Sequence, residues 1–173
     1  MALRVGMGGG LMAYIRFRGL EEYEQKLSQL ERAYCEQIAG KAIYAGAAIV
    51  TDAIKRGIEG LPVVSGYGTQ DAPLPGGVTA VQKQGLEDGL GIAPMQDDRG
   101  YLNVKIGFDG YNRTKTEKYP NGQPNQLVAR GVESGTSWKQ KKPFIRPAIN
   151  ASRKEAEQKM AEVIDEEIQK LME

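Results

Sequence analysis

Residues 20–58 read LEEYEQKLSQLERAYCEQIAGKAIYAGAAIVTDAIKRGI, and their pattern predicts the longest element of the chain. In its first half, apolar residues recur every three or four positions, which is the spacing of one helix face. They are Leu20, Tyr23, Leu27, Leu30, Tyr34 and Ile38. The second half is rich in alanine and glycine, which let a neighbouring element approach closely. The stretch therefore predicts one long, bent helix or two joined helices, with Gly40 as the candidate kink.

Two segments alternate apolar and polar residues, which is the pattern of a half-buried strand. The first is 13–18 (AYIRFR), ended by Gly19. The second is 101–108 (YLNVKIGF), where Leu102, Val104 and Ile106 would share one face.

Two short helices are predicted between the long ones. One covers 78–90, with Val81 and Leu86 pointing inward. The other covers 126–133, with Asn125 as its cap, and a strand is the alternative there.

A final helix is predicted to have Pro147 in its first turn, because proline is favoured at that position. One apolar stripe would run along it, formed by Ile149, Ala156, Met160, Val163, Ile164, Ile168 and Leu171. Long helices at both ends around a small antiparallel sheet predict an α+β fold. We expect a flexible segment over residues 1–12 and a single domain over 13–173.

The connections are dense in turn-forming residues. Residues 61–77 (LPVVSGYGTQDAPLPGG) are rich in Gly, Pro, Ser and Asp and predict a long mobile loop. Residues 92–100 and 109–124 are predicted as turn regions.

The composition excludes several kinds of chemistry. The chain has no histidine and one cysteine, Cys35. Catalysis by a Ser-His-Asp or Cys-His arrangement and most zinc sites are therefore excluded, and a reducing compartment is expected. The pair Asp97-Asp98 is interpreted as a capped turn, since further oxygen ligands for a cation are not visible nearby. We expect no enzyme, no catalytic, cofactor-binding or metal-binding residues and no cofactor.

The net charge of +1 hides an uneven distribution. Residues 99–154 carry 12 basic and 3 acidic residues, whereas residues 61–98 carry 1 and 5 and residues 155–173 carry 2 and 7. A basic block can bind nucleic acid, or it can meet an acidic face of another subunit. No apolar run approaches the roughly 18–20 residues that a membrane span needs, so no membrane partner is expected.

The sharpest cluster of candidate interaction residues lies in 132–147 (VESGTSWKQKKPFIRP), which holds the only tryptophan. We expect Gly135 to allow a turn, Glu133 to pair with Arg146 or to cap Thr136, and Phe144 to be buried. The candidate interaction residues are Glu133, Gly135, Trp138, Lys139, Lys141, Lys142, Phe144 and Arg146.

An ordered set of motifs resembles the head–tail joining, or tail-completion, proteins of long-tailed bacteriophages and prophages. Gly19-Leu20 before the long helix resembles the first motif of that family. Residues 132–136 (VESGT) resemble its V-E-x-G-T turn, and residues 143–148 (PFIRPA) resemble its P-F-[IL]-R-P-A motif. The resemblance covers residues 13–171, and it departs in the 61–77 loop, where Gly68 replaces the family's leucine.

The resemblance implies a minor structural protein of the virion neck or tail, made in the host cytoplasm and without catalysis. It implies a homo-oligomeric ring that contacts adjacent neck and tail proteins, with only passing contact with DNA. Two alternatives stay open. One is a DNA-binding module that uses the basic block 99–154, and the other is a tail terminator or tail tube subunit.

Overall fold

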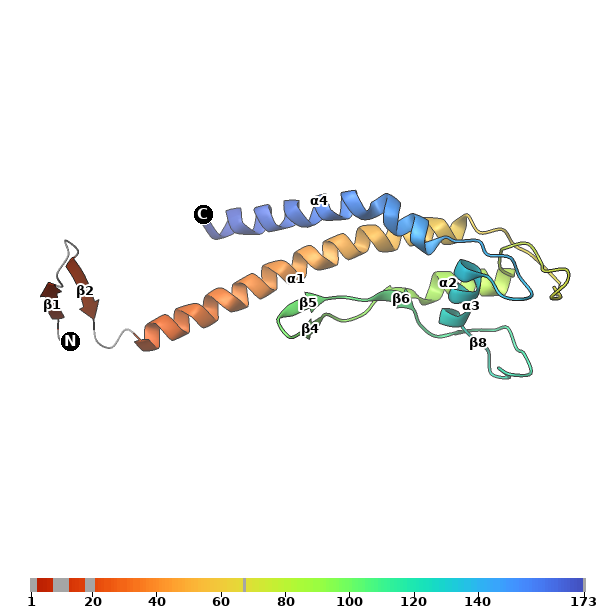
Figure 1. Cartoon of the computed structure of the whole chain (residues 1–173), viewed down its shortest axis with the longest axis horizontal. Helices are drawn as coiled ribbons and strands as arrows, with labels where there is room; N and C mark the ends of the chain where they lie inside the picture. Colours follow the sequence, from red (N-terminus) through yellow and green to blue (C-terminus); the bar gives the residue numbers. More distant parts are fainter. Residues whose placement is uncertain (1–2, 8–12, 18–20, 67, 173) are drawn as a thin grey trace. The chain divides into compact units, whose positions relative to one another are not determined.

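The computed structural model describes residues 3–7, 13–17, 21–66 and 68–172 (Figure 1). Within these ranges it contains four helices and eight short strands that pair two by two. Long helices near both ends and small antiparallel strand pairs confirm the predicted α+β class. Contacts divide the chain into two compact units, Met1–Ile38 and Ala39–Glu173.

In the first unit, β1 (Leu3–Met7) pairs with β2 (Ala13–Phe17) in antiparallel fashion, so that Val5 is opposite Ile15. The strand predicted at 13–18 is confirmed as far as Phe17, whereas β1 was not predicted. Residues 1–2, 8–12 and 18–20 lie outside the described part, and with them most of the flexible segment predicted over 1–12.

The predicted long helix is one continuous helix, α1 (Glu21–Glu59), and the boundary between the two units falls inside it. In the second unit, α1 runs antiparallel to α4 (Ile145–Met172) (Figure 1). Three contacts follow one another along the pair. Gly57 lies against Phe144, Gly46 against Met160, and Lys41 forms an ion pair with Glu167.

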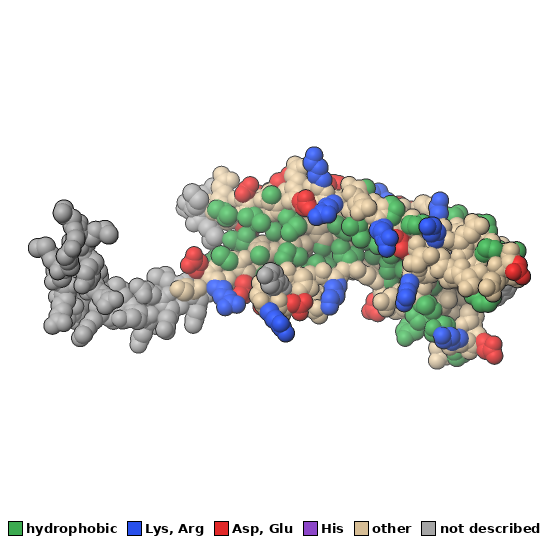
Figure 2. Space-filling view, viewed as in Figure 1, with side chains coloured by type: hydrophobic (Ala, Val, Ile, Leu, Met, Phe, Trp, Pro, Cys, Tyr) green, Lys and Arg blue, Asp and Glu red, His purple; other side chains and the backbone are tan. Residues whose placement is uncertain are grey.

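Small residues on α1 therefore let α4 approach closely, as predicted. Figure 2 shows apolar side chains along the line where the two helices meet.

The buried face of α4 differs in part from the predicted apolar stripe. Ala156 is buried and Met160 is half-buried, but Ile149 and Ile168 are 40% and 45% exposed. Ser152 is buried instead, because its Oγ donates a hydrogen bond to the carbonyl of Ala148, 2.8 Å away. A polar side chain satisfied within its own helix can occupy such a position, which a search for apolar residues overlooks.

The short elements complete the second unit. They are α2 (Ala80–Gly89), β3 (Leu90–Ile92), β4 (Gln96–Asp98), β5 (Tyr101–Asn103), β6 (Ile106–Phe108), β7 (Tyr111–Asn112), β8 (Gln123–Pro124) and α3 (Asn125–Ser134). Strand β3 pairs with β6, β4 with β5, and β7 with β8.

Two strand predictions need correction. The single strand predicted over 101–108 is interrupted at Val104 and Lys105, because β5 pairs with β4 while β6 pairs with β3. The region predicted as turn over 92–100 contains β4 and only a tight turn at its end.

Both short helices are confirmed, but two residues have other roles than predicted. Val81 is 46% exposed, whereas Leu86 is fully buried. Asn125 does not cap α3. It is buried, donates from Nδ2 to the carbonyl of Asp109 at 2.8 Å, and accepts from Asn112 at 3.3 Å.

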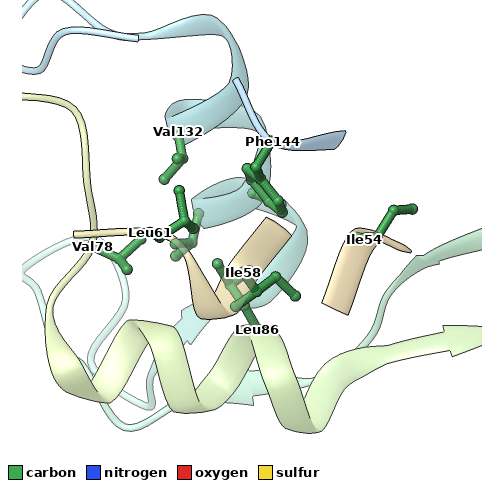
Figure 3. Packing of buried hydrophobic residues seen from close by; sticks show 9 residues of the cluster. Ile54, Ile58, Leu61, Val78, Leu86, Val132 and Phe144 are labelled. Atoms are coloured by element: carbon green, nitrogen blue, oxygen red, sulfur yellow. The ribbon is translucent and has the colours of Figure 1, made fainter. Parts of the chain in front are cut away.

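The core of the second unit lies where α1, α2 and α3 meet the start of α4 (Figure 3). Its buried members are Ile54, Ile58, Leu61, Val78, Leu86, Val128, Ala129, Val132 and Phe144. The ring of Phe144 meets that of Phe108 edge to face, with 6.1 Å between centroids. This core fixes the segment between α3 and α4, which holds the candidate interaction residues.

Candidate interaction site

Glu133, in the last turn of α3, caps the N-terminus of α4. Its carboxylate accepts three backbone N–H groups, those of Phe144 at 2.8 Å, Ile145 at 2.9 Å and Arg146 at 3.0 Å. The first N–H groups of a helix have no partner within the helix, and a carboxylate there also suits the helix dipole.

The charge of this carboxylate is favoured by its surroundings. Burial alone would raise the pKa of the Glu133 carboxyl. The hydrogen bonds from Ile145, Phe144 and Arg146, with the positive charge of Arg146, outweigh burial and hold the pKa below its ordinary value.

The role predicted for Glu133 is therefore corrected. The structure gives no side-chain ion pair between Glu133 and Arg146 within its described part, because the carboxylate is taken up by backbone N–H groups. Nor does Glu133 cap Thr136. The Thr136 hydroxyl instead accepts the N–H of Trp138 at 3.3 Å within the turn.

Gly135 ends α3 and allows the turn, as predicted. Its φ of 78° lies in the left-handed region, which disfavours other residues. A Cβ at this position would also lie 3.0 Å from the backbone nitrogen of Lys141. Both conformation and space therefore require glycine here.

The segment predicted as a mobile loop over 61–77 is irregular where the structure describes it, and its mobility stays a prediction. Backbone hydrogen bonds attach the segment to this turn. The N–H of Leu74 donates to the carbonyl of Trp138 at 2.9 Å, and the N–H of Gln140 donates to the carbonyl of Leu74 at 2.8 Å. At the base of the loop, the N–H of Val64 donates a hydrogen bond of 2.8 Å to the carbonyl of Val78. The loop and residues 136–140 thus form one surface.

The lysines of the cluster are not equivalent. Lys139 is half-buried, and its Nζ donates to the carbonyl of Gly77 at 3.2 Å. Burial lowers the pKa of the Lys139 ammonium. Lys141 and Lys142 are exposed, as is Arg146. Lys139 therefore holds the loop, whereas the other three cations are available to a partner.

The eight candidate residues fall into two groups. Glu133, Gly135, Lys139 and Phe144 build the local structure, and Phe144 is only 4% exposed. The outward group is Trp138, Lys141, Lys142 and Arg146, with Trp138 57% exposed.

A pocket of about 930 Å³ lies beside Trp138, between the 61–79 segment, the 114–116 segment and α3. We call it the basic groove. Leu74, Leu127 and Trp138 give it an apolar lining, and Lys115, Arg130 and Lys139 add positive charge. None of the described residues that line it is acidic.

Of the residues that line the groove, only Gly135, Trp138 and Lys139 were among the predicted interaction residues. Its lining comes from segments that are far apart in the chain, so no local motif could show it. The only signal was that Lys115 and Arg130 belong to the basic block 99–154.

The described residues give little support for a metal site or a membrane-spanning helix. Asp97 accepts the N–H of Gly100 at 2.6 Å and Asp98 accepts the side-chain amide of Asn103 at 2.9 Å, which agrees with the predicted capped turn. Over the described ranges, no three Cys, Asp or Glu side chains are grouped to hold a metal ion. None of the described helices has both the length and the apolarity for a membrane crossing.

No protein-family model matches this chain, and neither a curated protein nor a solved structure matches it. The relationship to phage neck proteins therefore stays a prediction from the sequence motifs.

Proposed function

We propose that this chain is a structural protein of a tailed-phage virion. It acts at the neck, joining head to tail or completing the tail, and it works by contacts between copies and with adjacent virion proteins. The proposal assigns no reaction and no cofactor to the chain.

The main support for the proposal is that the candidate residues of 132–147 separate into a group that builds the local structure and a group that is exposed. The residues shared with the family's motifs, above all Glu133, Gly135 and Phe144, have structural tasks that build the junction between α3 and α4. These structural tasks account for the motifs without a catalytic role. Trp138 and the neighbouring cations take no part in them and are exposed to solvent. An exposed tryptophan with flanking positive charge is a typical anchor for a protein partner.

The charge distribution supports self-association. The basic groove and the acidic residues of 155–173 belong to the same chain, so each copy carries both kinds of surface. Two different patches that match each other give a head-to-tail contact, and such contacts close into rings when the rotation allows.

The test measures assembly directly. We expect the purified protein to sediment as a closed oligomer of fixed size, to give rings in negative stain, and to be present in purified phage particles. Long tubes would favour a tail tube subunit, and capped tubes a tail terminator. A protein that stays single-copy in all conditions and is missing from particles would contradict the proposal.

Charge reversal tests which surface takes part. Lys141→Glu with Lys142→Glu changes exposed cations and keeps the Lys139 contact with the loop, so the fold should be unchanged. We expect this variant to assemble more weakly, and with a different salt dependence from the wild type. Unchanged assembly at every salt concentration would remove these lysines from the contact.

Nucleic acid is the second candidate, because Trp138 is exposed next to Lys141 and Lys142 and could stack on a base. Filter binding with duplex and single-stranded DNA separates the two. A steep loss of affinity with salt would favour DNA binding.

A further inference from the structure

We propose that the basic groove of one copy receives the acidic C-terminal end of α4 from the next copy. This inference rests on the proposed self-association and names the two surfaces that meet.

The basic groove has an apolar lining and positive charges, and none of the described residues that line it carries a negative charge. Lys115 and Arg130 line it and are exposed, and neither has an ion-pair partner within the described residues. Leu127 and Trp138 are 40% and 57% exposed beside them. A fitting partner would present apolar side chains together with carboxylates.

The end of α4 has this composition. Asp165 and Glu166 are exposed, and Ile168 is 45% exposed one turn further on. Asp165 has no ion-pair partner in the described part of the chain. Glu167, by contrast, is bound to Lys41 and Lys170 and helps to fix the helix against α1.

The same chain cannot make this contact with itself. The groove lies beside the segment that leads into α4 at Ile145, and Asp165 is 20 positions further along that helix. At 1.5 Å per residue the separation along the axis is roughly 30 Å. The contacts of Gly46 with Met160 and of Lys41 with Glu167 keep α4 straight along α1. The acidic end must therefore reach the groove of another copy.

The geometry of such a contact is heterologous, because groove and helix end are different patches. Each copy then uses its groove towards one neighbour and its helix end towards the other. The charges would steer the approach and set the register, while Ile168, Leu127 and Trp138 would lose exposed apolar surface.

The experiment uses paired charge reversals in the full chain. The groove variant carries Lys115→Glu and Arg130→Glu, and the helix-end variant carries Asp165→Lys and Glu166→Lys. Sedimentation velocity at low and high salt measures assembly. A matched control, Lys105→Glu with Lys118→Glu, makes the same charge change outside the groove.

We expect each variant alone to weaken assembly by about tenfold or more. The control should assemble like the wild type. A mixture of the two variants should recover assembly, because the unchanged groove meets an unchanged helix end and the reversed groove meets a reversed helix end. The chain with all four changes should form closed oligomers again, which also shows that the substituted chains fold.

The outcomes separate this inference from the proposed function. Rings that form normally in both variants would overturn the groove contact and leave the proposed function intact. Failure of the wild type to assemble and its absence from particles would remove both. If the groove variant assembles normally but loses binding to a fluorescent single-stranded oligonucleotide, the groove is a nucleic-acid site and the inference is wrong.

Discussion

The Oε2 atom of Glu133 lies 2.8 Å from the backbone nitrogen of Phe144, so the last turn of α3 holds the first turn of α4. With this hydrogen bond in place, Phe144 is buried in the core and α4 begins at Ile145, two residues before Pro147. A single carboxylate thus caps the helix at the residue where α4 begins.

Replacing Glu133 should destabilise the fold. We expect Glu133→Ala to lower the free energy of unfolding by about 1–2 kcal/mol, because three N–H groups lose their acceptor. Glu133→Gln keeps one amide oxygen and should lose less. Urea unfolding followed by circular dichroism measures both, with Glu155→Ala, an exposed glutamate on α4, as the control. Equal losses for Glu133→Ala and the control would contradict the capping role.

The same carboxylate should make stability depend on pH. Its pKa is lower in the folded than in the unfolded chain, so its contribution is fully present above the unfolded-state pKa. The contribution is lost as the pH falls through the folded-state pKa. We expect the wild type to lose stability in acid more steeply than Glu133→Gln. Parallel stability curves for the two proteins between neutral and acidic pH would show that Glu133 does not cause the difference.

Two glycines of α1 should respond in opposite directions to the same change. A Cβ on Gly46 would lie 2.7 Å from Cγ and Sδ of Met160, whereas a Cβ on Gly40 would meet only Met95 at 3.7 Å. Alanine gains roughly 0.5–1 kcal/mol over glycine within a helix. We expect Gly40→Ala to stabilise the fold by about that amount.

We expect Gly46→Ala to destabilise the fold by about 1–3 kcal/mol, since overpacking outweighs the gain in helix propensity. Met160→Ala should recover part of this loss in the Gly46→Ala background. The measurement is thermal unfolding of the wild type, Gly40→Ala, Gly46→Ala and the double variant Gly46→Ala with Met160→Ala. Similar stabilisation by both alanines would mean that α4 does not pack on α1 at Gly46.

The buried asparagine pair should be a further weak point. Asn125 donates to the carbonyl of Asp109 at 2.8 Å, accepts from Asn112 and is 3% exposed. We expect Asn125→Ala to cost about 1–3 kcal/mol, because the carbonyl and Asn112 lose a partner. Asn121→Ala, at an exposed position, should change stability by less than about 0.5 kcal/mol. Indistinguishable unfolding midpoints would contradict this role of Asn125.

The long helices could be predicted from the sequence, because they have a regular pattern. The segments and groups that contact one another in the fold could not. Both long helices were predicted because apolar and small residues recur over many turns. The strand over 101–108 was wrong in extent, because its two halves have different partners. Glu133 was predicted to pair with Arg146 or to cap Thr136, but its carboxylate accepts the backbone N–H groups of Phe144, Ile145 and Arg146, because the chain reverses at Gly135. The basic groove was missed since Leu74, Lys115 and Arg130 meet only in the folded chain.

The pairing of α1 with α4 also affects how the protein is made. The ion pair of Lys41 with Glu167 joins residues 126 positions apart. At a synthesis rate of about 5–20 residues per second, the ribosome needs roughly 6–25 seconds to produce the second after the first. During that interval the apolar side of α1 has no α4 to cover it. Folding of the second unit can therefore be completed only after Glu167 has been made.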